Sequence, residues 1–189
     1  RKLQHLISRY LQEKDSGCRY WTEAEVLLPP VSFDAFYLFY HFAKHFMQTG
    51  TGLRQVCDWV RYLHVHQSEL DKERLLADVR LLGLMPLWEI FGCIAVDYLG
   101  LPEQEFPGFN PDKRKKAGRV VSLIFKVGNF GQYAPIKGER PKSYYRGKLY
   151  AFGKWLWWKQ QIFTLSPLIF SRWSLYSFGY SLRVALLRL

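Results

Sequence analysis

The segment from Phe39 to Trp59 constrains the fold most strongly, because it reads as two apolar helices joined by a short glycine-containing turn. His41 and His45 are four residues apart, which places them one turn apart on the same side of the first helix. Arg54 and Asp58 repeat this spacing on the second helix. The sequence therefore predicts a helical hairpin that carries four polar side chains in an apolar setting.

Large apolar side chains and one cysteine surround these four polar residues in the sequence. They are Phe36, Phe39, Phe42, Phe46, Leu53, Val56, Cys57 and Val60. A helix face turned to solvent rarely carries so many large apolar groups. We therefore predict that some of the four polar groups are buried and satisfy one another across the hairpin.

The spacing of apolar residues follows the helical period along nearly the whole chain, and no run shows the strict alternation of a half-exposed strand. Residues 19–28 suit an extended segment that ends at two prolines. We expect helices at about residues 2–12, 33–48, 51–66, 68–82, 86–99 and 112–126, and from 143 onward with a break at Pro167. The sequence therefore predicts a mainly α fold, a single helical domain of about six to eight helices around a central helical hairpin at residues 33–66.

Short polar residues stand where several of these helices are expected to begin. They are Ser32, Thr51, Ser68, Asp71 and Asp112. Their side chains can accept a hydrogen bond from the unpaired amide groups of a first helical turn. Gly83 stands where the helix after Asp71 is expected to stop, because glycine readily adopts the left-handed conformation that ends a helix.

The composition predicts a folded domain with one strongly basic half. Of the 189 residues, 49% are hydrophobic, which is enough for a substantial core and argues against a disordered chain. Residues 1–100 carry a net charge of −1 and residues 101–189 a net charge of +12. A basic surface of this kind attracts phosphate, anionic lipid, nucleic acid or an acidic protein, and the charge alone does not choose among them.

Cys18, Cys57 and Cys93 are odd in number, widely spaced and without a CxxC pair. We interpret them as buried thiols in a reducing compartment, with no metal or redox site among them. The start of the sequence shows no signal-peptide pattern, so we expect a cytoplasmic protein.

The two histidines admit three interpretations. Imidazoles at positions i and i+4 of a helix can share one Zn²⁺, and further ligands would come from Asp58, His64 or His66. In the interpretation that we favour, His41 and His45 bind no metal and hydrogen-bond across the hairpin to Asp58 or to backbone. The third interpretation is contact with a substrate held by another domain.

Arg54 and Asp58 also admit more than one role. Their spacing suits an ion pair on a helix surface, which would contribute little to stability. A partly buried Arg54 could instead bind a phosphate through its planar guanidinium group, or brace the turn at residues 50–52. We favour bracing of the turn.

The second half of the chain holds two further features. A basic run at residues 113–116, with Arg119, is usually a solvated helix face, and the surrounding positive charge makes contact with an anion an alternative. The segment from Tyr144 to Tyr180 contains thirteen aromatic residues interleaved with lysines and arginines. Its longest uncharged stretch is too short to span a bilayer, but the segment could lie in the membrane interface or pack on a domain. No RNP, KH or helix-turn-helix signature supports nucleic-acid binding.

The hairpin resembles a known family. An apolar helix with His-x-x-x-His, a turn with glycine and then Leu-Arg-Gln-x-x-Asp are similar to the second half of the bacterial uncharacterised nucleotidyltransferase family, of the polymerase-β-like superfamily. That family is frequent in capsular and exopolysaccharide gene clusters of Bacteroides-type bacteria. The opening Arg-Lys-Leu-Gln, the pair Pro29-Pro30 and the sequence Gly128-Asn129-Phe130-Gly131 support the resemblance.

The resemblance implies a catalytic α/β domain upstream, in which an Asp-x-Asp triplet at a strand end holds Mg²⁺ and the nucleotide. No Asp-x-Asp, Glu-x-Asp or Asp-x-Glu triplet follows a strand-like run in this sequence. The nearest paired acids, Glu23 and Glu25, precede an apolar run and follow no glycine-rich turn. The resemblance therefore implies that residues 1–189 are a helical C-terminal module, which lacks the catalytic carboxylates.

The function that we expect is support of the catalytic domain and of the acceptor side in a nucleotidyltransferase of surface polysaccharide biosynthesis. Arg54 is the expected substrate contact, with His41, His45 and Asp58 as its organisers, and the acceptor is unknown. We expect no catalytic residue in this chain, which alone would be inactive. The alternative is a non-catalytic binding module that docks its basic aromatic surface on an acidic partner or peripherally on the inner membrane face.

Overall fold

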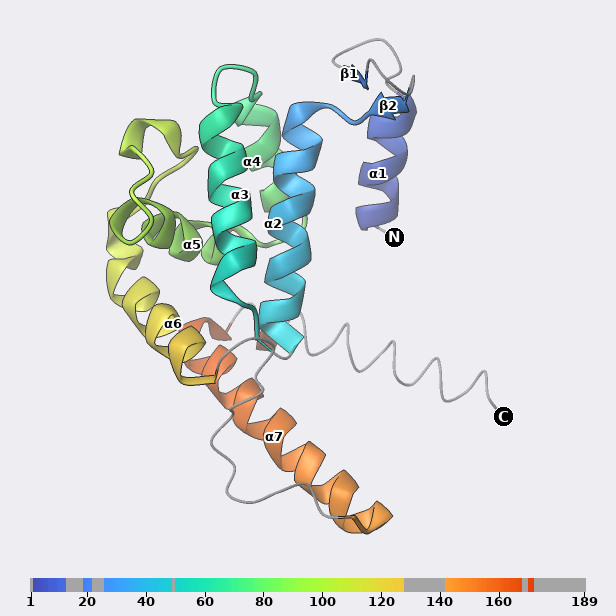
Figure 1. Ribbon diagram of the computed structural model, residues 1–189, viewed down its shortest axis with the longest axis vertical. Coiled ribbons are helices and arrows are strands. Elements are labelled where there is room, and N and C mark those ends of the chain that lie inside the picture. The colour runs from blue at the N-terminus through green and yellow to red at the C-terminus, as the bar shows by residue number, and fades with distance from the viewer. Residues whose placement is uncertain are drawn as a thin grey trace.

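The computed structural model describes residues 2–12, 19–21, 26–48, 50–127, 142–167 and 170–171. Within these ranges the chain forms seven α-helices, two short 3-10 helices and one small β-hairpin (Figure 1). The prediction of a mainly α, single helical domain is confirmed.

The elements follow one another along the chain with bounds close to those expected. They are α1 (Lys2–Gln12), β1 (Arg19–Trp21), β2 (Val26–Leu28), α2 (Val31–Gln48), α3 (Leu53–Val65), α4 (Lys72–Leu81), α5 (Met85–Asp97), η1 (Glu103–Glu105), η2 (Pro111–Lys113), α6 (Arg114–Val127) and α7 (Tyr144–Leu165). The strands β1 and β2 pair antiparallel, with Arg19 opposite Leu28. The extended segment expected before the two prolines is this hairpin.

Two of the predicted helix ends are confirmed. Asp71, and not Ser68 in the preceding turn, is the N-cap of α4, and its side chain accepts a hydrogen bond of 3.0 Å from the amide of Arg74. Gly83 follows the end of α4 with a φ of 70°. Residues other than glycine rarely adopt this left-handed conformation, which explains why the helix stops there.

Three other predicted caps are wrong. The helix α2 already begins at Val31, and the buried hydroxyl of Ser32 accepts a hydrogen bond of 2.9 Å from the amide of Asp71. Gly52, and not the buried Thr51, precedes α3. The side chain of Asn110 accepts a hydrogen bond from the amide of Asp112, so Asn110, and not Asp112, caps the short helix η2 that precedes α6.

Aromatic side chains from several helices meet in the core. The ring centroids of Phe39 and Trp88 lie 4.9 Å apart, those of Trp59 and Trp88 lie 5.2 Å apart, and Phe106 packs against both tryptophans. Most of these pairs are edge-to-face or tilted, the arrangements that ring quadrupoles favour. Because α2, α3, α5 and the loop after η1 each supply a ring, this cluster holds the central hairpin in place.

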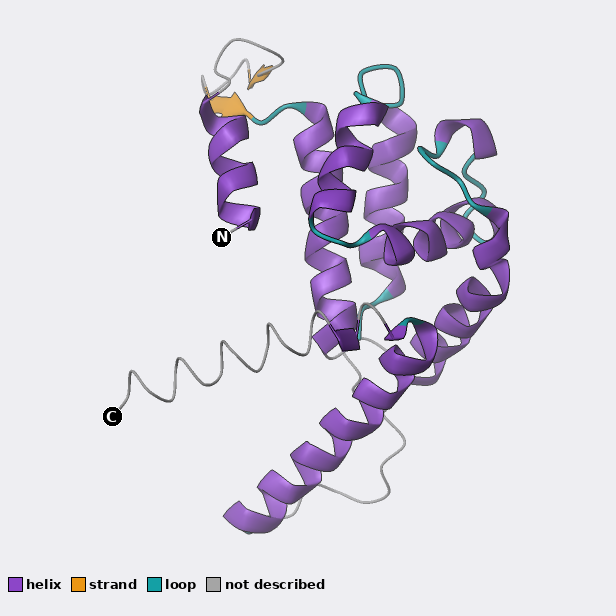
Figure 2. Ribbon diagram, turned by 180° about the vertical axis from the view of Figure 1, so that it is seen from behind, coloured by secondary structure: helices purple, strands orange, loops and turns teal. Residues whose placement is uncertain are grey.

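The helix α7 packs on the end of α2 with its C-terminal half only. Figure 2 shows that its first half extends away from the other described helices. Trp158 donates a hydrogen bond of 2.8 Å to the carbonyl of Phe46, and Lys159 donates one of 3.1 Å to the carbonyl of Met47. These carbonyls belong to the last turn of α2, and carbonyl groups in a last helical turn have no hydrogen-bond donor within their own helix. Side chains of α7 thus complete the C-terminus of α2.

Candidate functional site

The four polar residues singled out on the hairpin lie on the outer sides of α2 and α3. His41, Arg54 and Asp58 are exposed, and His45 is half-buried. The buried residues of α2, such as Phe39 and Phe42, are on the opposite side of that helix. The same holds for α3, whose buried residues are Val56, Trp59, Val60 and Leu63.

The prediction that some of the four polar groups are buried fits only His45, which is half-buried, because the other three are exposed. The apolar residues that surround them in the sequence do not surround them on the helix, because residues one or two apart point in different directions. The aromatic side of α2 faces the core and the histidine side faces outward. High apolar content around a polar residue did not indicate burial here.

Three of the four polar residues, His41, His45 and Asp58, nevertheless border one seam between α2 and α3. Tyr62 of α3 donates a hydrogen bond of 3.3 Å to the carboxylate of Asp34 of α2, so these two sides of the helices face each other. His41 and His45 follow Asp34 at i+7 and i+11, and Asp58 precedes Tyr62 by four residues, so they continue the same two sides. We call these five residues the outer seam.

The histidines of the outer seam contact each other. Their ring centroids are 4.7 Å apart in an edge-on arrangement, and the ring of Tyr37 lies 6.3 Å from that of His41. Partial burial lowers the pKa of His45, and the neighbouring His41 and Lys44 lower it further. His45 is therefore neutral at neutral pH and can accept or donate a hydrogen bond through its ring nitrogens.

Two of the other residues that could complete a metal site with this pair, His64 and His66, are engaged elsewhere. His64 lies 2.6 Å from the carboxylate of Glu105, and His66 lies 2.9 Å from that of Glu69. Among the described residues, no group of three or more His, Cys, Asp or Glu side chains is placed to hold a metal ion. The outer seam also carries the carboxylates of Asp34 and Asp58, but neither is placed with the two imidazoles as the set of ligands that a zinc site needs.

Arg54 does not brace the turn between α2 and α3, contrary to the prediction. Its side chain is exposed, and the described part of the chain gives it no hydrogen bond or ion pair. The turn is held by a hydrogen bond of 3.0 Å from the amide of Gly50 to the carbonyl of His45, and by a short contact between the side chains of Thr51 and Gln55. The guanidinium of Arg54 is therefore open to an anionic ligand.

A buried polar cluster at Asp78 was not predicted from the sequence. The carboxylate of Asp78 accepts hydrogen bonds of 2.6 Å from the Tyr10 hydroxyl and of 2.6 Å from the Arg9 guanidinium, and it ties α1 to α4. Burial and the bond to Asp78 raise the pKa of Tyr10, so its hydroxyl remains a donor. The available signal was the position of Asp78 beside Leu75 and Val79 on the apolar side of α4.

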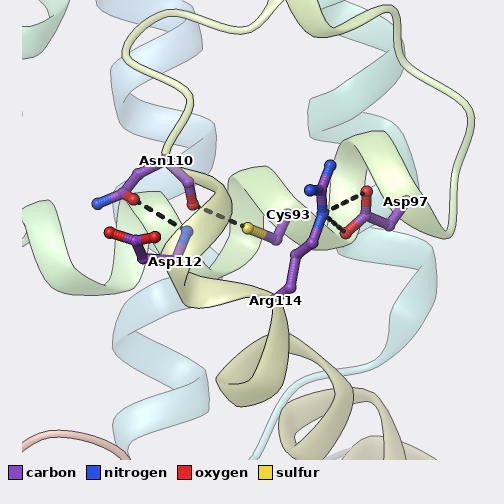
Figure 3. A network of polar contacts seen from close by, with 5 residues as sticks. All are labelled: Cys93, Asp97, Asn110, Asp112 and Arg114. Atoms are coloured by element: carbon purple, nitrogen blue, oxygen red, sulfur yellow. Dashed lines mark hydrogen bonds and ion pairs between the residues drawn. The ribbon is translucent and has the colours of Figure 1, made fainter.

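A second polar network joins α5 to α6 (Figure 3). Cys93 donates a hydrogen bond of 3.2 Å to the carbonyl of Asn110, and Arg114 donates one of 3.0 Å to Asp97. Burial raises the pKa of the Cys93 thiol, which keeps it protonated and unreactive. Cys93 is buried as predicted, whereas Cys57 is exposed and that prediction is wrong. Cys18 lies outside the described residues.

The basic run at the start of α6 is partly neutralised by acids of α5. Lys113 lies 3.3 Å from the carboxylate of Glu89, and Arg114 pairs with Asp97. Lys115 and Arg119 remain exposed. The run therefore serves in part to fix α6 on α5, while Arg114, Lys115 and Arg119 face solvent.

Comparison with known families places the hairpin in a wider context. Residues 7–100 match the model of the family described as uncharacterised nucleotidyltransferase. The chain is thus similar to that family over these residues. It includes the outer seam, Arg54 and the Asp78 cluster, and it ends before α6 and α7. No curated protein and no solved structure matches the chain.

None of the described helices combines the length and the apolar character that crossing a bilayer requires.

Proposed function

We propose that this chain is the helical C-terminal module of a nucleotidyltransferase that acts in surface polysaccharide biosynthesis. The observation that carries the proposal is the family match over residues 7–100, which contains the whole α2–α3 hairpin. In this role the module supports a catalytic α/β domain that lies upstream in the full-length protein. Its outer seam faces the nucleotide or the acceptor.

The chemistry of nucleotidyl transfer requires carboxylates that hold Mg²⁺ at the reacting phosphates. The residues of this chain do not fit such a site. Its sequence has no Asp-x-Asp triplet after a strand-like run, and the described residues hold no suitable cluster of acids. We therefore assign the magnesium ligands to the upstream domain and no catalytic residue to this chain.

The part that we assign to this chain is binding and orientation of an anionic group. Arg54 is exposed, stands at the start of α3, and carries a planar guanidinium that suits a phosphate oxygen pair. Asp58 stands one turn further along, where a carboxylate can orient the guanidinium once a ligand is bound. The neutral His45 and its neighbour His41 offer hydrogen bonds to hydroxyl groups of a nucleotide or sugar acceptor.

The test compares nucleotide binding and transfer by the full-length protein and by this chain. The full-length protein should release pyrophosphate from a nucleoside triphosphate in the presence of Mg²⁺ and an acceptor. In that protein, Arg54→Ala should lower kcat/KM by about tenfold or more, because a hydrogen bond to a charged group contributes about 1.5–3 kcal/mol.

Arg80→Ala is the matched control, since Arg80 is also an exposed arginine within the family match but lies on α4. It should leave kcat/KM within about twofold. Equal losses in the two variants would remove the role assigned to Arg54. Absence of any nucleotide binding by the full-length protein would remove the proposed function itself.

A further inference from the structure

The helix α7 carries a stripe of large apolar side chains that the described chain leaves uncovered. The residues of this apolar stripe are Tyr145, Leu149, Phe152, Leu156 and Phe163. Tyr145 is 81% exposed, Leu149 is 72% exposed and Phe152 is 56% exposed. Contiguous exposed apolar groups of this size mark a surface that binds something.

The spacing of the stripe places its residues on one side of the helix. Four of them stand at i, i+4, i+7 and i+11, which is the repeat of one side of an α-helix, and Phe163 follows at i+18, beyond the buried Lys159. The side that docks on the body is different and holds Trp158, Ile162 and Leu165. The helix is therefore apolar on two sides, one of which is already packed on α2 and one of which is free.

The charges beside the stripe are all positive. Residues 142–167 contain five lysines and arginines and no aspartate or glutamate. Lys148 lies on one flank of the stripe and Arg146 on the other, Lys142 precedes the first turn of the helix, and all three are exposed. An apolar strip between two cationic borders is the pattern of a helix that lies in the interface of an anionic membrane.

The aromatic residues fit the same surface. Tyr144, Tyr145 and Trp155 are exposed near the stripe, and their rings combine an apolar body with a polar group. Such rings are favoured at the depth of lipid headgroups. A second copy of α7 is a poorer partner, because it would set five positive charges against five others with no acid between them.

We propose that the apolar stripe of α7 lies on an anionic lipid surface, with Lys142, Arg146 and Lys148 at the headgroups. The first half of α7 extends away from the body, so it can lie flat on a membrane without obstruction by the other described helices (Figures 1 and 2). The inference goes beyond the proposed transferase function and is independent of it, because α7 lies outside the family match.

Vesicle co-sedimentation tests the proposal. The purified protein is mixed at low salt with vesicles of phosphatidylcholine alone, or with vesicles that also hold about 30% phosphatidylglycerol. It should sediment with the anionic vesicles only. Raising the salt to about 0.5 M should release it, because the screening length then falls to a few ångströms. Failure to bind anionic vesicles, or equal binding to neutral ones, would overturn the proposal.

Paired variants distinguish binding through the apolar stripe from nonspecific binding through any exposed apolar side chain. The double variant Leu149→Ser with Phe152→Ser should abolish binding, and circular dichroism should remain unchanged because both side chains are exposed. Phe125→Ser is the control, since Phe125 is 72% exposed on α6. An equal loss in the control, or retained binding in the double variant, would contradict the assignment of the stripe.

A second pair of variants tests the charges. Replacing Lys142, Arg146 and Lys148 by Gln should weaken binding by about fivefold for each charge removed. The matched control replaces Lys115, Arg119 and Lys126, three exposed cations of α6, by Gln. If the control weakens binding as much, total charge and not the border of the stripe drives the association. Binding to the full-length protein's other domain in place of lipid would likewise overturn the proposal.

Discussion

Asp78 accepts hydrogen bonds of 2.6 Å from both the Tyr10 hydroxyl and the Arg9 guanidinium while almost fully buried. Asp78→Ala would leave the Tyr10 hydroxyl without an acceptor in a buried position. We expect it to lower the free energy of unfolding by about 1–3 kcal/mol, the usual cost of an unsatisfied buried group. Asp58→Ala, at an exposed position, should change it by no more than about 0.5 kcal/mol. Urea unfolding of both variants checks the difference, and equal effects would contradict it.

His45 gives the molecule a defined dependence on pH. Its pKa is lowered by partial burial and by His41 and Lys44, so the unfolded chain takes up a proton more readily than the folded one. The free energy of unfolding should therefore fall as the pH drops from the ordinary histidine pKa of 6.5 through the lower folded value. His45→Gln should lose part of this slope between about pH 7.5 and pH 5.5.

The measurement is urea unfolding at both pH values, together with an NMR titration of the His45 ring. His41→Gln serves as a control, because removal of the neighbouring imidazole should raise the pKa of His45 towards its ordinary value. A folded His45 pKa above 6.5 would reverse the sign of the expected slope.

At the scale of elements, the sequence predicted which segments are helical but not which way their polar sides face. The helical period and the stop at Gly83 depend on local chemistry, and both were predicted correctly. Burial depends on where other helices pack, and for His41 and Asp58 it could not be read from their neighbours in the chain. Ser32 shows the same limit, because its hydroxyl binds the amide of Asp71, 39 residues away.

The junction of α2 and α7 depends on a bond that no local pattern reveals. Trp158 donates to the carbonyl of Phe46 across 112 residues of sequence. Trp158→Phe keeps an aromatic ring, though a smaller one, and removes the donor, so we expect a loss of about 1–3 kcal/mol in the free energy of unfolding. Trp155→Phe is the control, because Trp155 is exposed. An equal effect of both substitutions in urea unfolding would show that the carbonyl has another partner.

Lys159 belongs to the same junction, and its burial there carries the desolvation cost of a charged group. It is buried, and burial lowers the pKa of its ammonium group, while it donates to the carbonyl of Met47. A cation at the C-terminal end of α2 interacts favourably with the helix dipole, which offsets part of the desolvation cost. The position of Lys159 thus explains why a charged residue lies in the otherwise apolar contact of α7 with the body.

The packing of α5 against the loop after η1 leaves no room at Gly92. A Cβ atom built there would lie 2.4 Å from the ring of Phe106, which is itself held between Trp59 and Trp88. Gly92→Ala should therefore destabilise the protein by about 1–3 kcal/mol despite the better helix propensity of alanine. Gly118→Ala on α6 meets only the Tyr98 hydroxyl at 3.2 Å and should be neutral or stabilising. Thermal unfolding of the two variants should move in these different directions.

At the scale of the whole molecule, charge and family likeness divide the chain in nearly the same place. The family match ends at residue 100, and residues 1–100 are close to neutral. The positive charge lies beyond it, in a half whose described helices are α6 and α7. The division of charge was readable from the sequence, because it depends only on composition. The end of the family match was not, since the opening Arg-Lys-Leu-Gln and the sequence Gly128-Asn129-Phe130-Gly131, which supported the resemblance, lie outside it. The exposure of the α7 stripe was not, since it depends on which side of α7 docks on α2.

The lack of clustered carboxylates in the described residues predicts how the purified chain behaves in an assay of nucleotidyl transfer. Two-metal phosphoryl chemistry needs clustered carboxylates, and the described residues hold no group of acids placed for it. We therefore expect this chain alone to release no pyrophosphate from any nucleoside triphosphate in the presence of Mg²⁺. The full-length protein, assayed at the same concentration, is the positive control. Steady, Mg²⁺-dependent pyrophosphate release by this chain alone, abolished by chelation, would place catalytic carboxylates within residues 1–189 and contradict the assignment of catalysis to an upstream domain.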